Sequence, residues 1–135
     1  MSPTSRTAAL CLMAVCLAVA AAAQTVVGAP PIKRTPLQRF DVPGTVFETV
    51  IGIAEIAPSI AIGRHTHPGP ESGYVMAGSF QLLIDGQAPR LLNVGDSYQV
   101  PAGAVHDAKA GPEGAKVIAT YVVQKGQPLA APVAP

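Results

Sequence analysis

Cysteine is scarce in this sequence of 135 residues, and both copies, Cys11 and Cys16, fall in the apolar N-terminal stretch. The rest of the chain therefore has neither a disulfide framework nor a reactive thiol. Its stability must come from a hydrophobic core, to which a metal or a partner subunit can add.

An excess of charge of either sign is also lacking. Lysine and arginine total 9 and the acidic residues total 8, and Arg6 alone accounts for the difference. Because no basic stripe emerges along the chain, we expect no nucleic-acid partner.

Residues 1–23 have the pattern of a signal peptide. Arg6 precedes an apolar run from Ala8 to Ala22, and Ala21-Ala22-Ala23 before Gln24 is typical of a cleavage site. A retained anchor is the alternative, but the run is short and rich in alanine for a membrane span. We therefore expect export to the periplasm or beyond, with cleavage near Ala23 and no stable membrane anchor.

A helical period is absent from the rest of the sequence, which instead consists of short β segments cut by Gly, Pro, Asn and Asp. We expect an extended N-terminal arm over 24–45 and one β domain over 46–124. A Pro/Ala-rich tail over 125–135 is expected to be disordered or draped on the surface. Many short antiparallel strands favour a β-sandwich or barrel, and periodicity alone does not separate the two.

The motif richest in chemistry is Gly63-Arg64-His65-Thr66-His67-Pro68-Gly69-Pro70-Glu71. Alternation along a strand puts His65 and His67 on one face, and the Pro-Gly-Pro break can return Glu71 towards them. Two imidazoles and a carboxylate are typical ligands of a divalent metal. The alternative is an accidental His-x-His on a surface strand. A third histidine, His106, lies in a second patterned segment and argues against this alternative.

These two segments resemble the paired motifs of the cupin superfamily. In the first motif His65, His67, Glu71 and Gly78 fall on the family spacing, with Ser59 where a glycine is expected. In the second, Gly95, Pro101, Gly103 and His106 match, with Ala110 in place of an asparagine. The resemblance covers about residues 46–123 and is to small single-domain bacterial cupins. It implies an all-β, double-stranded β-helix (jelly-roll) barrel, a metal held by His65, His67, Glu71 and His106, and frequent dimerisation.

Such a donor set leaves a centre with a net charge of about +1 and open positions on a six-coordinate ion. It suits small anionic or enolisable ligands, and Mn, Fe or Zn are the metals we expect. The resemblance implies a metal-dependent oxygenase or related oxidoreductase acting on a small organic molecule, with Glu71 as a catalytic base. A non-catalytic small-molecule-binding protein is the alternative, and a metal buffer is a third.

Strand parity extends these expectations to neighbouring side chains. If the histidines face inward, Ala61 and Gly63 share their face, and an apolar row of Ile60, Ile62, Tyr74 and Met76 faces outward. Such a row suggests either packing against the N-terminal arm or a homodimer interface. By the same parity Asp107 faces away from the site as a surface charge, whereas Tyr98 and Arg90 are either at a pocket mouth or ordinary strand residues.

Overall fold

The structure, a computed structural model, describes residues 30–134, and these contain strands and loops but no helix. Residues 1–29, which include the expected signal peptide and its cleavage site, lie outside the described residues. In the described part there is accordingly no helix that could span a membrane. The strands are β1 (Ile32–Asp41), β2 (Phe47–Ile56), β3 (His65–Thr66), β4 (Glu71–Ile84), β5 (Arg90–Asn93), β6 (Ser97–Val100), β7 (His106–Gln124) and β8 (Ala131–Pro132).

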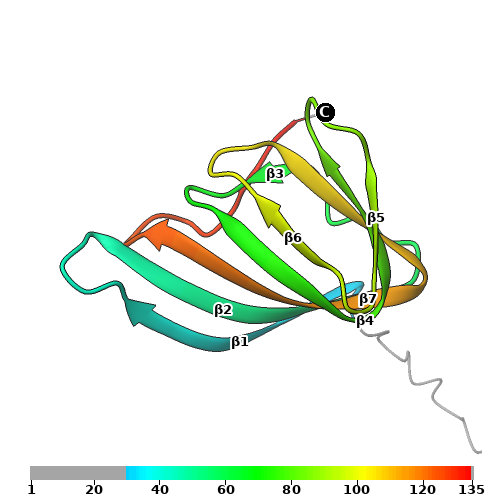
Figure 1. Ribbon diagram of the computed structural model, residues 1–135, viewed down its shortest axis with the longest axis horizontal. Coiled ribbons are helices and arrows are strands. Elements are labelled where there is room, and N and C mark those ends of the chain that lie inside the picture. The colour runs from blue at the N-terminus through cyan, green and yellow to red at the C-terminus, as the bar shows by residue number, and fades with distance from the viewer. Residues whose placement is uncertain (1–29, 135) are drawn as a thin grey trace, which may run out of the picture.

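The long strand β7 organises the sheet. Its C-terminal half pairs antiparallel with β2 on one side and with β4 on the other, and its first residue pairs with β3. β4 pairs in turn with β5 and β6, while β1 pairs with β2. Figure 1 shows the resulting curled sheet, with β1 and β2 along one side and β5 at the opposite end. The expected all-β jelly-roll class is confirmed.

A bend in β4 lets one strand serve two parts of the barrel. The pairing of β4 with β7 shifts register between Val75 and Ala77 and again between Gly78 and Phe80. Gly78 has a φ of 67°, and a Cβ there would collide with the Gly114 carbonyl of β7. Only glycine allows both this backbone conformation and this close approach. The strand therefore bends at Gly78 and continues without a break from Glu71 to Ile84.

The predicted N-terminal arm contributes β1, an edge strand. Pro36 lacks an N–H and fits an edge, and the register of β1 against β2 is irregular between Pro36 and Gln38. Glu55 of β2 forms ion pairs with Lys33 of β1, at 3.2 Å, and with Lys116 of β7, at 3.4 Å. Cross-strand pairs of this kind fix the register of an exposed strand.

The core lies between the bent halves of the sheet. Val75, Phe80, Val100 and Val123 are its largest fully buried side chains. As parity predicted, Glu71 and Val75 point inward, and Tyr74 and Met76 are 48% and 42% exposed.

The parity prediction is wrong for the segment before β3. Ile60 and Ile62 pack against the core, and Ala61 and Gly63 are exposed. The reason is that residues 57–64 do not form a continuous strand. Ser59 has a φ of 61° and Gly63 a φ of 98°, so the alternation of faces is interrupted on both sides of Ile60–Ile62.

The C-terminal tail returns to the barrel. Its strand β8 pairs with β3, with Pro132 opposite His65 and Ala131 opposite Thr66, and the Val133 N–H donates to the Arg64 carbonyl at 3.0 Å. In Figure 1 the tail leaves the end of β7 and passes β3 on its way to the C terminus. Of the two alternatives expected for the tail, draping on the surface is the one that the described residues 125–134 show.

Candidate metal centre

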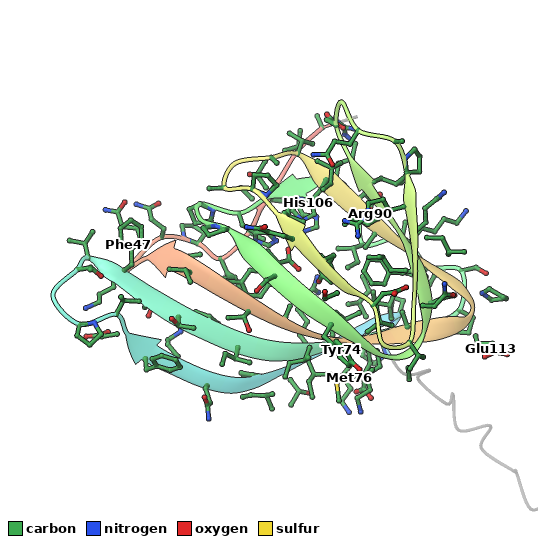
Figure 2. The ribbon with its side chains drawn as sticks, in the orientation of Figure 1. Phe47, Tyr74, Met76, Arg90, His106 and Glu113 are labelled. Carbon is green, nitrogen blue, oxygen red and sulfur yellow. The ribbon has the colours of Figure 1, made fainter. Side chains whose placement is uncertain are left out.

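Three histidines meet inside the barrel near β3. His65 of β3 lies opposite His106, the first residue of β7, and His67 follows one residue after β3. Their candidate ligand nitrogens all lie within 4.8 Å of one another. Figure 2 shows His106 at the start of β7, on the β3 side of the barrel and away from Tyr74 and Met76. The two sequence motifs are also joined directly, since the Gly103 N–H donates to the His67 carbonyl at 2.9 Å.

Each of these imidazoles is oriented by a backbone carbonyl. Nδ1 of His65 bonds to the Gly63 oxygen at 2.7 Å, Nδ1 of His106 to the Ala104 oxygen at 2.9 Å, and Nδ1 of His67 to the Leu129 oxygen at 2.6 Å. A carbonyl oxygen only accepts, so Nδ1 carries the proton in all three rings. In the neutral ring Nε2 then holds a lone pair, as a metal ligand requires.

Glu71 lies against two of the three histidines. The hydrogen bond from the Val122 N–H to the Pro70 carbonyl, at 3.2 Å, ties the Pro-Gly-Pro segment to β7 and so places Glu71 at the start of β4. Its Oε2 lies 3.0 Å from His67 Nε2 and 3.4 Å from His106 Nε2. Among the described residues no contact of this kind joins Glu71 to His65.

A tyrosine holds the other oxygen of this carboxylate. The Tyr98 hydroxyl of β6 donates to Glu71 Oε1 at 2.7 Å. Burial opposes ionisation of Glu71, but His106 and His67, when their rings are doubly protonated, and the Tyr98 hydroxyl donate hydrogen bonds that outweigh it and lower the pKa of the carboxyl to about 2. Glu71 is therefore a carboxylate at neutral pH.

The same surroundings perturb the neighbouring groups. Burial lowers the pKa of His65. Burial is also the largest single effect on His106, but the hydrogen bonds to Glu71 and Ala104 and the charges of Glu71 and Asp107 together outweigh it and raise the pKa. The pKa values of Tyr98 and Tyr121 are raised, chiefly by burial and then by the nearby charge of Glu71. Both tyrosines therefore stay neutral and act as hydrogen-bond donors or as cavity wall.

The donor atoms fit a divalent ion. Two ligands at right angles, each about 2.1 Å from an ion, lie about 3.0 Å apart, close to the separations of Glu71 Oε2 from the two histidine nitrogens. His67 Nε2 is buried and has no hydrogen-bond partner. A lone pair facing a carboxylate is unfavourable without a cation or a proton between them. His65, His67 and His106 can therefore hold a transition-metal ion, with the Glu71 carboxylate beside two of them, and a proton competes for the same place.

A cavity of about 260 Å³ opens above these residues. Its apolar lining residues come chiefly from β2 and β7, and the histidines, Glu71, Tyr98 and Tyr121 form its polar end. Arg34 of β1 also lines it, and the charge of Arg34 acts on Tyr121. No carboxylate of residues 30–134 forms a salt bridge with Arg34. A small ligand with an apolar part and a negative charge would suit these surroundings.

The sequence interpretation covered the histidines and Glu71 but missed several of their neighbours. Asp107 does face away from the site, and its carboxylate accepts from the Gly63 N–H at 2.9 Å. Tyr98 proves to be a half-buried partner of Glu71, whereas Arg90 is exposed at the start of β5. Tyr121, Arg34 and Leu129 were not singled out. Counting alternate residues along β7 from His106 would place Tyr121 on the outer face. The count fails because the strand is irregular between its two halves.

Comparisons with known proteins agree with this architecture. The family model described as Cupin domain matches residues 52–123. Over 67 residues the chain is 37% identical to dimethylsulfoniopropionate lyase DddW from Ruegeria pomeroyi, covering 50% of this chain and 43% of the lyase. The chain thus spans less than half the length of that curated relative.

Two solved structures show the same fold at low sequence identity. KdgF from Halomonas sp. superposes with a TM-score of 0.59 and 22% identity, covering 73% of this chain and 84% of KdgF. The DMSP lyase DddQ from Ruegeria pomeroyi superposes with a TM-score of 0.58 and 19% identity, covering 63% of this chain and 43% of DddQ. Together with the match of the family model to more than half of the sequence, these findings show that the chain belongs to the cupin family.

Proposed function

We propose that this protein is a metal-dependent enzyme acting on a small organic carboxylate. The observation that carries the proposal is the convergence of three histidines whose Nδ1–H groups all bond to backbone carbonyls, so that their Nε2 lone pairs are free for a metal. This arrangement lies at the polar end of a cavity that also contains an unpaired arginine.

His65, His67, His106 and Glu71 would hold the ion. Manganese, iron and zinc all suit mixed imidazole and carboxylate ligation, so the donor set does not select one of them. When bound, such an ion supplies a positive charge that binds and polarises an oxygen of the substrate.

Arg34 is the reason for expecting a negatively charged substrate. Arg34 is an exposed residue of β1 that lines the cavity to which Glu71 also belongs, and a guanidinium can form two parallel hydrogen bonds to a carboxylate. The volume of about 260 Å³ lies below the roughly 300–1,000 Å³ of pockets for drug-sized ligands. We therefore expect a compact substrate with a carboxylate and a short apolar portion.

Elimination is the reaction that we place first, because DddW is by name a lyase of such a compound. In an elimination from a sulfonium carboxylate, a base takes the proton from the carbon next to the carboxylate. The C–H electrons form a C=C bond, and the C–S bond breaks with its electrons leaving on the thioether. Glu71 is the base within the site. Its low pKa makes it a weak base while its neighbours hold it as a carboxylate, so Glu71 would act as the base after leaving the ion.

Oxidoreductase activity is the second candidate. It is favoured by the ligand count, since three imidazoles and one carboxylate leave two positions of a six-coordinate ion free. The oxidation consumes oxygen and the elimination does not, so a single experiment that measures oxygen uptake can distinguish the two reactions.

The test combines metal analysis with turnover. Purified protein should contain nearly one transition-metal ion per chain, and H65A and H106A should lose most of it. Loaded protein should release a thioether from sulfonium carboxylates without consuming oxygen; oxygen uptake with phenolic or keto-acid substrates would instead favour the oxidoreductase. Ligand binding without turnover in either panel would leave a non-catalytic binding protein. Unchanged metal content in both variants would refute the metal centre.

Substrate charge is tested separately with two arginines. R34Q should raise KM for carboxylate substrates by about 10- to 100-fold, because a charged hydrogen-bond donor is lost. R90Q, at an exposed arginine outside the cavity, is the matched control and should leave KM unchanged. Equal effects of both substitutions would refute the assigned role of Arg34.

We also propose that the protein works outside the cytoplasm and as a homodimer. Export is supported by Arg6, the apolar run from Ala8 to Ala22 and the alanines before Gln24. Dimerisation is supported by the exposed apolar side chains of Tyr74 and Met76 on the outer face of β4 (Figure 2). Fractionation of the native host and sedimentation at several protein concentrations test the two statements.

A further inference from the structure

The partner of His67 differs in kind from the partners of the other two histidines. His65 and His106 each bond to a carbonyl only two residues earlier in the chain, Gly63 and Ala104. His67 bonds to the carbonyl of Leu129, which is 62 residues away in the C-terminal tail. Two of the imidazoles are thus oriented by their own segments, and the third depends on a distant one.

The tail is held in place by main-chain pairing with the segment that carries the histidines. Pro132 and Ala131 of β8 lie opposite His65 and Thr66, and the Val133 N–H donates to the Arg64 carbonyl. Leu129 and Ala130 also line the cavity. These contacts place the tail across the site, although it lies beyond residues 52–123, which the family model matches.

We propose that residues 129–133 are a positioning element of the metal centre. The inference rests on the metal role proposed for the histidines. Docking of the tail presents the Leu129 carbonyl to His67 Nδ1, which keeps the proton on Nδ1 and the lone pair on Nε2. Without the tail, His67, now 5% exposed, would be open to solvent. Its proton could then occupy either nitrogen, and its ring could rotate away from Glu71.

The expected size of the effect follows from other metal sites. Loss of a group that orients a ligating histidine typically lowers metal affinity by about 10- to 100-fold. The proposal therefore predicts weaker metal binding, and it also predicts that the change in the protein begins at His67 and leaves the carbonyl bonds of His65 and His106 intact.

Full-length chains can test this with a matched pair of substitutions. V133P removes the N–H that donates to Arg64, whereas V133A keeps it and removes most of the side chain. A chain ending after Gln127 removes the whole segment, and one ending after Val133 is its control. Zn²⁺ and Mn²⁺ affinities are measured by competition with a chelator. The histidine tautomers of the metal-free protein are read from ¹⁵N chemical shifts at an alkaline pH at which the rings are neutral.

We expect V133P and the chain ending after Gln127 to bind both metals about 10- to 100-fold more weakly than their controls. The His67 shifts should change to those of mixed tautomers, with those of His65 and His106 unchanged. Unchanged affinity and tautomer in V133P would overturn the proposal, as would an equal change in all three histidines. If the shortened chain fails to fold, V133P decides. If the full-length protein binds neither metal, the proposed function fails, while the His67 tautomer still reports whether the tail orients this ring.

Discussion

Replacing Tyr98 by phenylalanine removes one hydrogen bond from the buried carboxylate of Glu71 and little else. The lost bond, 2.7 Å from hydroxyl to Oε1, is made to a charged acceptor. Bonds of this type contribute about 1.5–3 kcal/mol to stability. The edge-on packing of the Tyr98 ring against Phe80, with centroids 5.4 Å apart, is retained by phenylalanine. The free energy of unfolding at neutral pH should therefore fall by about 1.5–3 kcal/mol.

The assay is urea unfolding in the presence of a chelator, so that metal binding does not contribute. Y74F is the matched control, because Tyr74 carries the same hydroxyl on the exposed side of β4 and should change stability by less than about 0.5 kcal/mol. Removing the donor also raises the pKa of Glu71, so the difference between Y98F and the parent should shrink as the pH falls and Glu71 becomes protonated. If Y98F were as stable as Y74F at neutral pH, the Tyr98–Glu71 hydrogen bond would not have the role assigned to it.

Three further predictions concern single positions. S59G should raise the free energy of unfolding by up to about 1 kcal/mol, because Ser59 has the left-handed backbone that glycine adopts without strain; a loss in thermal or urea unfolding would contradict this. G73A should destabilise the protein by about 1–3 kcal/mol, because its Cβ would collide with the Tyr98 ring; S72A, at an exposed neighbour, is the control in the same unfolding assay. E55Q should flatten the acid limb of the stability–pH curve. Hydrogen bonds from two lysines lower the pKa of Glu55. The stabilisation that the Glu55 carboxylate contributes at neutral pH is therefore lost as the pH falls through that pKa. An unchanged acid limb in E55Q would show that Glu55 makes no such contribution.

The candidate ligands could be predicted from the sequence because their spacing is set by local geometry. His65 and His67 are two residues apart on an extended segment, and the sequence Pro68-Gly69-Pro70 indicates a break in the strand before Glu71. His106 follows Pro101-Ala102-Gly103 in a comparable way. Turns were equally readable: Asp96 bonds to Asn93 through both its backbone and its side chain, as the Asn-Val-Gly-Asp sequence indicated.

The inward packing of Ile60 and Ile62 could not be read in the same way. A parity argument assumes an unbroken strand, and Ser59 breaks it with a conformation that serine rarely adopts. Nothing in the side chain of a serine signals a left-handed backbone. The family motif has a glycine where this chain has Ser59. The left-handed backbone of Ser59 explains why a glycine is usual at this position.

Contacts between distant segments were beyond any local pattern. The hydrogen bond from His67 Nδ1 to the Leu129 carbonyl and the approach of Arg34 to the cavity depend on how the tail and β1 fold back onto the barrel. Both segments are poor in the hydrophobic alternation that marks a strand. Their pairing is specified mainly by backbone hydrogen bonds, which any sequence can supply.

The positions of the site residues along the chain bear on substrate specificity. His65, His67, Glu71 and His106 all lie within residues 52–123, which the family model matches, so the metal-binding part of the site belongs to the shared barrel. Arg34 lies before that range and Leu129 after it, and both line the cavity. In the proposed site the two flanking segments therefore add a positive charge and part of the cavity wall beside the candidate metal ligands. Exchanging the segment that carries Arg34 between cupins should alter substrate choice more than metal content, because the donor atoms stay on the barrel while this part of the cavity wall changes.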